Sequence, residues 1–393
     1  MEQDTAMDLI RFNRDLRIDF FRGVALWMIF VDHMPGNVLG ELTLKNIALS
    51  DAMEVFVMLA GYGAGLAYGK AMDRSGWLYA AAECARRAWT LYIAHIFLFV
   101  VFAAQVTYAA QFMDRTDYLD EINLDVLGAD PYGALLHVLL LHYQPAYMNI
   151  LPVYVVLLLA FSVLMPLLRR PWLLGGLSLT LYAATRLDGL VLPNWTGGGW
   201  YFNPLAWQVL FMIGAIVAYA PSTIPHPRQR SLQIGLDALA AIMLILGLGL
   251  QILSRWPDTV HDLSATLPHL LFSIDKESLH PLRLASILAM AWLAARLIPA
   301  SANWLRGRIA APFILAGQHS LPVFCSGIFL SFMGRLLMEQ ESGLWRQIWV
   351  NASGTLILAG IAMVAAWYQA KSRNRSTRNA QAAKPAQEAE GIR

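Results

Sequence analysis

Four ionisable side chains follow Arg17 within the first long apolar run of the sequence, RIDFFRGVALWMIFVDHMPGN. They are Asp19, Arg22, Asp32 and His33. On a helix that turns by about 100° per residue, Arg22 and His33 lie within about 20° of each other, and Asp19 lies within about 60° of Arg22. Charged groups inside a membrane are costly and usually functional. We therefore expect these three side chains to line one face that looks into a helix bundle or a wet cavity.

The separation of Arg22 and His33 suits chemistry that joins the two sides of a membrane. Eleven helical residues span about 16 Å, which places Arg22 in the inner half and His33 in the outer half of the bilayer. Pro35 and Gly36 are expected to end or kink the helix just beyond the histidine. A neutral imidazole can take a proton from a hydroxyl group. The pattern predicts a tunnel with a fixed positive charge near the cytoplasm and a titratable base near the outside.

The second apolar run, SDAMEVFVMLAGYGAGLAYG, carries two carboxylates near its outer end. Asp51 and Glu54 lie one turn apart, at about the depth of His33. Either could orient the imidazole or raise its basicity, as carboxylates do for catalytic histidines. Glycines recur every four residues further along, and such a ridge predicts close helix packing. These glycines are Gly61, Gly65 and Gly69.

Arg86 and Arg87 open the third apolar run at its inner face. Two interpretations are open. The arginines could be positive-inside anchors, or they could hold the phosphates of a cytoplasmic ligand.

Composition places these segments in a membrane. Of 393 residues, 57% are hydrophobic and only 14% are charged, whereas soluble domains have about 45–50% and about 25%. This excludes a soluble enzyme, a disordered chain, a secreted disulfide scaffold and a nucleic-acid binder. We predict an all-α polytopic transmembrane bundle of about ten helices, and 132–143 is too short to span. The predicted spans are 18–38, 51–69, 88–110, 148–168, 172–187, 202–219, 232–253, 281–299, 312–336 and 347–369.

The distribution of lysine and arginine orients the bundle. If both termini are cytoplasmic, most of the 29 lysine and arginine residues lie on the cytoplasmic side, as the positive-inside rule requires. We predict a cytoplasmic segment over 1–16, one transmembrane domain over 17–370 and a disordered cytoplasmic tail over 371–393. The acidic stretch 111–131 is expected to be a solvated outer loop. No metal site is expected, because the histidines and aspartates of the outer loop 254–280 lack tight ligand spacing.

The two N-terminal runs together resemble the start of OpgC-type proteins. These are inner-membrane succinyltransferases of osmoregulated periplasmic glucans, within the wider acyltransferase 3-like superfamily. The superfamily hallmark Arg-x10-His is matched by Arg22 and His33, and Glu54 through Gly61-Tyr62 resembles the next signature. The resemblance runs from about 15 to 335. Three later stretches also carry it: NILPVYVVLLLAFSVLMPLL from Asn149, FNPLAWQVLFMIGA from Phe202 and AGQHSLPVFCSG from Ala316.

The resemblance implies a multi-pass acyltransferase of the bacterial inner membrane. It would move an acyl group, succinyl in this family, from cytoplasmic acyl-CoA to a hydroxyl of a periplasmic glucan. Acyl-CoA is then a donor substrate, and no permanently bound cofactor is expected. The expected partners are acyl-CoA, the glucan or another envelope glycan, and the lipid bilayer, with no nucleic acid. The oligomeric state is left open. The alternatives are an O-acetyltransferase of another envelope glycan and a transporter of glycans or acyl groups.

Each candidate residue then has an expected role. His33 is the general base, with Asp51 or Glu54 as its supporting carboxylate. The residues expected to bind acyl-CoA are Arg22, Asp19, Arg86 and Arg87. The residues expected to contact the substrate are Asn37, His319 and Ser320. Gln318 is a further candidate to donate a hydrogen bond to the oxyanion that forms in the reaction. A succinyl carboxylate needs a cation, for which the outer-side candidates are Arg186, Arg283 and Arg335.

Overall fold

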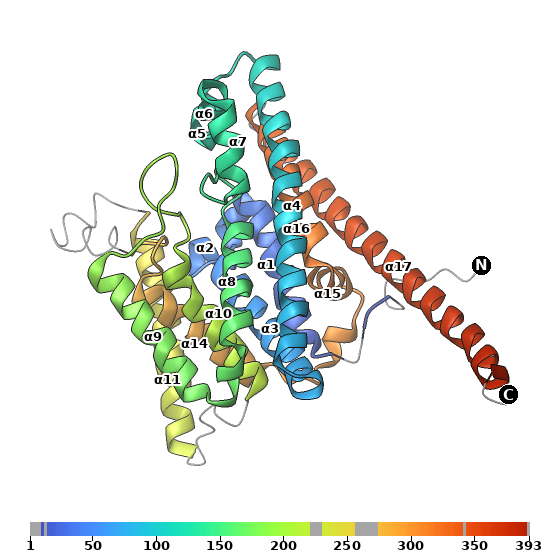
Figure 1. Ribbon diagram of the computed structural model, residues 1–393. Helices are drawn as coiled ribbons and strands as arrows, with labels where there is room; N and C mark the ends of the chain where they lie inside the picture. Colours follow the sequence, from blue (N-terminus) through green and yellow to red (C-terminus); the bar gives the residue numbers. More distant parts are fainter. Residues whose placement is uncertain (1–8, 12–13, 221–229, 256–273, 341–342, 391–393) are drawn as a thin grey trace. The chain divides into compact units, whose positions relative to one another are not determined.

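The computed structural model describes residues 9–11, 14–220, 230–255, 274–340 and 343–390 (Figure 1). These residues form helices joined by turns, and within them the only β-type pairing is an isolated bridge between Pro193 and Gly199. The all-α prediction is therefore confirmed. The chain divides into two compact units, a terminal unit of residues 1–30 with 298–393 and a central unit of residues 31–297.

Helices form at each of the ten apolar segments. Helix α1 (Leu16–Asp32) begins in the terminal unit and ends in the central unit. The rest of the terminal unit contains η4 (Asn303–Arg306), α15 (Ala311–Gln318), α16 (Ser320–Gln340) and α17 (Leu344–Glu390). The central unit contains η1 (Val38–Leu42), α2 (Leu44–Ile47), α3 (Ala52–Ser75), α4 (Trp77–Phe112), α5 (Asp117–Ile122), α6 (Asp125–Ala129), α7 (Pro131–Leu139), α8 (Ile150–Leu164), η2 (Met165–Arg169), α9 (Pro171–Asp188), α10 (Pro204–Tyr219), α11 (Arg230–Leu253) and α14 (Pro281–Leu297).

Six helices of the described residues are long and apolar enough to cross a membrane. They are Ala52–Ser75, Trp77–Phe112, Ile150–Arg169, Arg230–Leu253, Ser320–Gln340 and Leu344–Ser372. Helix α10 is apolar but shorter. The 132–143 stretch is helical only as far as Leu139, in α7, which has nine residues. The chain is thus a membrane protein with several apolar helices, while the count of ten spans and the cytoplasmic placement of both termini remain predictions.

One predicted span, 312–336, is broken in the structure. Helix α15 ends at Gln318, and His319 leaves helical geometry with φ −120° and ψ 45° before α16 begins. Pro322 explains the break, because its ring would clash with the carbonyl group four residues earlier, at Gln318, and it has no N–H to donate. The proline was visible in the sequence, and it was the signal for this break.

Helices α3 and α10 of the central unit run in the same direction with their backbones in contact. A Cβ atom at Gly61 or Gly65 would overlap with the carbonyl oxygens of Phe211 and Ala215, and one at Gly214 would overlap with α3. The close packing predicted from the glycine ridge is therefore confirmed. Because both contacts have the same residue offset, the two helices begin at the same end of the central unit.

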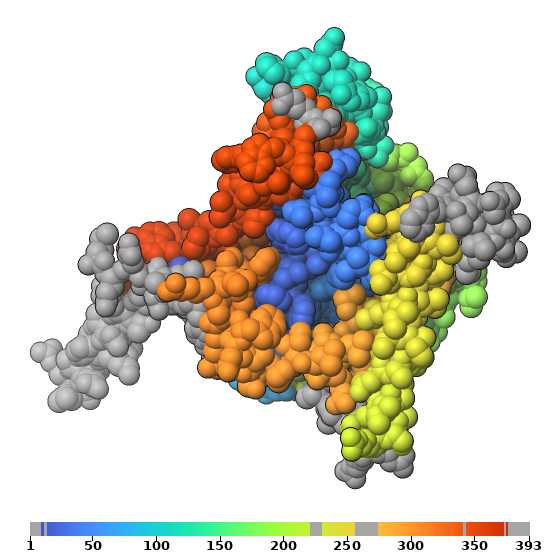
Figure 2. All heavy atoms as spheres, turned by 180° about the vertical axis from the view of Figure 1, so that it is seen from behind, coloured from blue at the N-terminus to red at the C-terminus, as the bar shows by residue number. Residues whose placement is uncertain are grey.

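The other helices of the central unit surround this pair. Helix α10 also packs on α9 and α8, and α8 packs along α4. Helix α11 packs on α14 and on α2, and Figure 2 shows its yellow spheres beside the blue segment that includes α2. Helices α5 to α7 lie together near the end of α4 and the start of α8 (Figure 1). This layout gathers the starts of α3, α8, α10 and α14, and the loops before them, at one end of the unit, here called the site end.

Candidate functional site

His33 directly follows α1 and lies in the central unit. Helix α1 ends at Asp32, and Gly36 takes a left-handed φ of +73°, as the Pro-Gly pair predicted. The half-buried imidazole meets the ring of Tyr147 edge-on, with 4.7 Å between ring centroids and 73° between planes. Tyr147 has a φ of +69° and also contacts Phe102 of α4. The loop between α7 and α8 therefore helps to position the histidine.

Asn37 shapes the turn that follows His33. Its side-chain oxygen accepts a hydrogen bond from the N–H of Leu39, and its amide donates to the carbonyl of Val31. The neighbouring Thr43 hydroxyl donates to Asp32, with 2.6 Å between the oxygens. These bonds hold the chain between α1 and α3, while the substrate role of Asn37 stays a prediction.

Asp51 and Glu54 start helix α3 as a capping box. Asp51 accepts a hydrogen bond from the N–H of Met53, and Glu54 accepts one from the N–H of Asp51. Such reciprocal bonds satisfy donors that the first helical turn leaves unpaired. Glu54 is completely buried. The signature Asp-x-x-Glu before an apolar run was readable in the sequence, so this local role could have been predicted.

Two cations from the other loops and helices of the central unit neutralise these acids. The guanidinium of Arg283, on α14, donates from Nε to Glu54 at 2.7 Å and approaches Asp51 at 3.3 Å. The ammonium of Lys276 lies 2.5 Å from Asp51. Burial alone would lower the pKa of Lys276, but the carboxylates of Asp51 and Glu54 raise it above its usual value. We call these four residues the ion cluster; it contains two acids and two bases.

The three arginines expected to bind a succinyl carboxylate all have acidic partners in the structure. Arg283 belongs to the ion cluster. Arg186 contacts Asp275 at 2.6 Å, and Arg335 contacts Glu339 at 2.6 Å. Each would have to exchange a protein carboxylate for the ligand. Lys276, which sequence reasoning missed, lies in a loop with no helical period to draw attention to it.

Asp19 belongs to a network inside the terminal unit. The amide of Gln318, at the end of α15, donates to this buried carboxylate at 3.0 Å. Arg14 lies 3.3 Å from it and Arg22 lies 3.8 Å from it. A Cβ atom at Gly317 would overlap with the backbone of Asp19, so α1 and α15 meet backbone to backbone. The negative charge expected to assist donor binding is thus compensated by three neighbours.

The remaining predicted residues are spread over both units. His319 and Ser320 lie half-buried at the break between α15 and α16 of the terminal unit. In the central unit, Arg86 forms an exposed pair with Glu83, and Arg87 is half-buried. The fifteen residues of α4 between Arg87 and Phe102 span about 22 Å, so the arginines lie far along the helix from the site end. Their roles toward acyl-CoA stay predictions.

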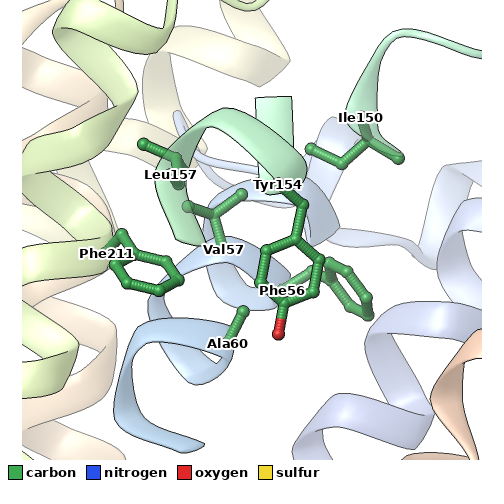
Figure 3. A pocket seen from close by; sticks show the side chains of 7 residues that line it. All are labelled: Phe56, Val57, Ala60, Ile150, Tyr154, Leu157 and Phe211. Carbon is green, nitrogen blue, oxygen red and sulfur yellow. The ribbon is translucent and has the colours of Figure 1, made fainter. Parts of the chain in front are cut away.

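An apolar pocket lies between α3, α8 and α10 of the central unit (Figure 3). Tyr154 supplies the one polar group among the side chains that line it. The lining residues are Phe56, Val57, Ala60, Ile150, Tyr154, Leu157 and Phe211. Such a lining can accept an apolar chain, but it offers few groups for a reaction.

The described residues contain no group of three His, Cys, Asp or Glu side chains that could hold a metal ion. His261 and His269, which were considered in the sequence, lie outside the described residues.

Comparison with known proteins identifies the family. A family model described as OpgC protein matches residues 14–370, which is nearly the whole chain. No curated protein and no solved structure matches the chain. The match begins two residues before α1 and ends within α17, so it covers His33, the ion cluster and the Asp19 network. The chain therefore belongs to the OpgC family.

Proposed function

We propose that this protein is a glucan-modifying acyltransferase of the bacterial inner membrane. It takes an acyl group, succinyl, from acyl-CoA on the cytoplasmic side and transfers it to a hydroxyl of a periplasmic glucan. The observation that carries the proposal is the family match over residues 14–370. The apolar helices support a membrane location, and His33 supplies a base of the type that the reaction needs.

The reaction requires a base because a sugar hydroxyl is a weak nucleophile near neutral pH. In the proposed step, neutral His33 takes the hydroxyl proton as the oxygen attacks the thioester carbon. The C–O ester bond forms, the C–S bond breaks, and the imidazolium returns its proton to the leaving thiolate of CoA. No further reactant is needed, because the donor thioester and the acceptor hydroxyl together supply all the atoms of the new ester and of free CoA thiol.

The ion cluster has a positioning role in this proposal. Asp51, Lys276 and Arg283 tie the starts of α3 and α14 to the 274–280 loop. Asp32, at the end of α1, lies within electrostatic range of Asp51 and Lys276. The ion cluster thereby connects the starts of α3 and α14. We propose that Asp51 or Glu54 supports the imidazole from this position.

Donor binding is assigned to the cationic side chains on the inner side. Arg22 lies on α1, eleven residues before His33, and Arg86 and Arg87 lie in the first third of α4. Guanidinium groups bind phosphates well, because their planar donors match the phosphate oxygens. We expect the phosphates of CoA to bind guanidinium groups among these arginines, and the pantetheine arm to carry the thioester toward the histidine.

The proposal is tested with membranes that contain the protein and with matched membranes that lack it. Each is given succinyl-CoA or acetyl-CoA labelled in the acyl group, together with purified unsubstituted periplasmic glucan. Label that appears in the glucan as an alkali-labile ester, only with the protein and succinyl-CoA, supports the proposal. Label from acetyl-CoA alone would keep the chemistry and overturn the donor.

Transport provides the contrasting outcome. A transporter would move glucan or acyl groups across a sealed vesicle without forming a covalent ester. Absence of ester from both donors, combined with vesicle uptake of either compound, would refute the acyltransferase and establish the transport alternative.

A further inference from the structure

Aromatic and imidazole rings gather beside the candidate site in the central unit. His137 of α7 stacks on Trp195 with 4.8 Å between ring centroids and 16° between planes. His142 stacks on His137 at 5.9 Å and 24°, and Tyr143 meets Trp195 edge-on at 5.6 Å. The rings come from α7 and from two loops, 140–149 and 189–203. Figure 1 shows α7 near the start of α8, where the first loop ends.

Backbone hydrogen bonds fix the two loops to each other and to α7. The N–H of Trp195 donates to the carbonyl of His142 at 2.8 Å, and the N–H groups of His142 and Tyr143 donate to the carbonyl of His137. Leu141 turns the chain with a left-handed φ of +60°, a conformation that costs a non-glycine residue energy. The ring group is thus a built feature and not a chance contact of mobile side chains.

Several buried polar atoms in these loops have no hydrogen-bond partner among the described residues. Trp200 is 4% exposed, and its indole N–H donates to nothing; Gln144 is 5% exposed, and its side-chain oxygen accepts nothing. The oxygen of Asn149 and the Nδ1 atom of His137 are also unpartnered. Buried polar groups are nearly always paired, so these four atoms are candidates to bind a polar ligand.

The same loop reaches the proposed base. Its residue Tyr147 contacts His33, and its residues His142 and Tyr143 contribute to the ring group. Only four positions separate Tyr143 from Tyr147. The loop therefore connects the ring group to the residue that contacts the imidazole.

The loops contain no charged residue. The segments LLHYQPAYMN at 140–149 and GLVLPNWTGGGWYFN at 189–203 lack Asp, Glu, Lys and Arg. These segments therefore supply no cation of their own to a phosphate or a carboxylate, and the nearby ammonium of Lys276, 5.3 Å from the ring centroid of Phe202, is already paired with Asp51. A neutral polyhydroxylated ligand fits better, because aromatic faces carry negative charge that attracts the C–H faces of a sugar ring. The free donors and acceptors can bind its hydroxyl groups, as in pockets with few polar atoms among aromatic ones.

We infer that loops 140–149 and 189–203, together with His137, form a carbohydrate-binding platform that presents a sugar hydroxyl to His33. Trp195 and His142 provide the stacking faces, and Trp200, Gln144 and Asn149 provide hydrogen bonds. The identity of the carbohydrate as the periplasmic glucan acceptor rests on the proposed function, whereas the carbohydrate class rests on the platform itself.

The test measures glucan binding without any acyl donor, so it does not depend on turnover. The full chain is placed in lipid nanodiscs, and binding of fluorescently labelled unsubstituted glucan is followed by equilibrium titration. We expect Trp195→Ala to weaken binding at least tenfold and Trp195→Phe to retain most of it. The matched control is Trp172→Ala, which removes an exposed tryptophan at the start of α9 and should leave binding unchanged.

A second pair of variants covers the case in which Trp195→Ala does not fold. Trp200→Phe deletes an N–H that has no partner among the described residues and keeps an aromatic ring in its place, so the chain should fold with a modest loss of stability while binding weakens several-fold. His142→Ala removes an exposed ring and should act in the same direction. Unchanged binding in both foldable variants would overturn the platform, and so would a wild-type chain that binds no glucan. Glucan binding without acyl transfer would refute the proposed function and leave the platform standing.

Discussion

Replacing Arg283 by methionine tests whether the ion cluster holds the site end together. The substitution keeps an unbranched apolar stem but removes the guanidinium that contacts Glu54 at 2.7 Å and Asp51 at 3.3 Å. Glu54 is completely buried, so its charge would lose its main partner without gaining water. Breaking a buried ion pair by removing one partner costs about 3–5 kcal/mol. Lys276 cannot compensate in full, because its contact is with Asp51.

A second ion pair of the same unit provides the matched control. Arg186 and Asp275 approach to 2.6 Å, as Arg283 and Glu54 do. The side chains of Arg186 and Asp275, however, are 26% and 34% exposed. Exposed pairs contribute about 0–1 kcal/mol. We therefore expect Arg186→Met to be nearly neutral. The two pairs match in distance, whereas Arg283 is more buried and has Asp51 as a second partner, so the comparison tests the effect of burial together with that second contact.

The assay is thermal unfolding of the purified protein in detergent, followed by loss of the monodisperse peak on size exclusion. Arg283→Met should unfold well below wild type, and Glu54→Gln in the same chain should restore part of the loss, because it removes the uncompensated charge. Equal unfolding temperatures for Arg283→Met and Arg186→Met would refute the argument. A further loss of stability when Glu54→Gln is added to Arg283→Met would also refute it.

Three further predictions concern packing, pH and the terminal unit. Gly61→Ala should destabilise by about 1–3 kcal/mol because its Cβ would overlap with α10, whereas Gly176→Ala, which meets open space, should be neutral or slightly stabilising in the same thermal assay. The pKa of His280 is lowered by burial and by Arg186. Because the unfolded chain therefore binds more protons than the folded chain below about pH 6.5, the stability should fall as the pH drops below that value. His280→Asn should flatten this pH dependence of stability. Asp19→Asn should lower the free energy of unfolding by about 1–3 kcal/mol, because it leaves Arg14 and Arg22 facing a neutral amide. Thermal unfolding measures this loss, and an unchanged transition temperature would contradict the assigned network.

Hydropathy predicted where the helices form because a bilayer demands long apolar segments with internally paired backbones. The end of α1 could also be predicted, since Pro35 and Gly36 disfavour helix in any environment. The same reasoning was not applied to Pro322, so the break at His319 was missed although its cause is local. Helix position and local breaks are thus within reach of the sequence.

Partners distant in the sequence were not predictable in this way. Asp51 and Arg283 are separated by 232 positions, and an ion pair leaves no periodic trace in either segment. Tyr147, which contacts His33, lies in a short loop where neither helical nor strand periodicity applies. Asp51 and Glu54 could be named as candidates from their type and spacing, but their cationic partners required the fold.

The most direct test of the account is acyl transfer by purified protein that differs only at His33. Wild type, His33→Ala and the control His280→Asn are reconstituted at equal amounts in liposomes with labelled succinyl-CoA and unsubstituted glucan. The account predicts ester-linked label in the glucan with wild type and with His280→Asn, and at least a hundredfold less with His33→Ala, because a general base contributes about 10²–10⁴ in rate. Undiminished transfer by a folded His33→Ala chain would contradict the assignment of His33 as the base.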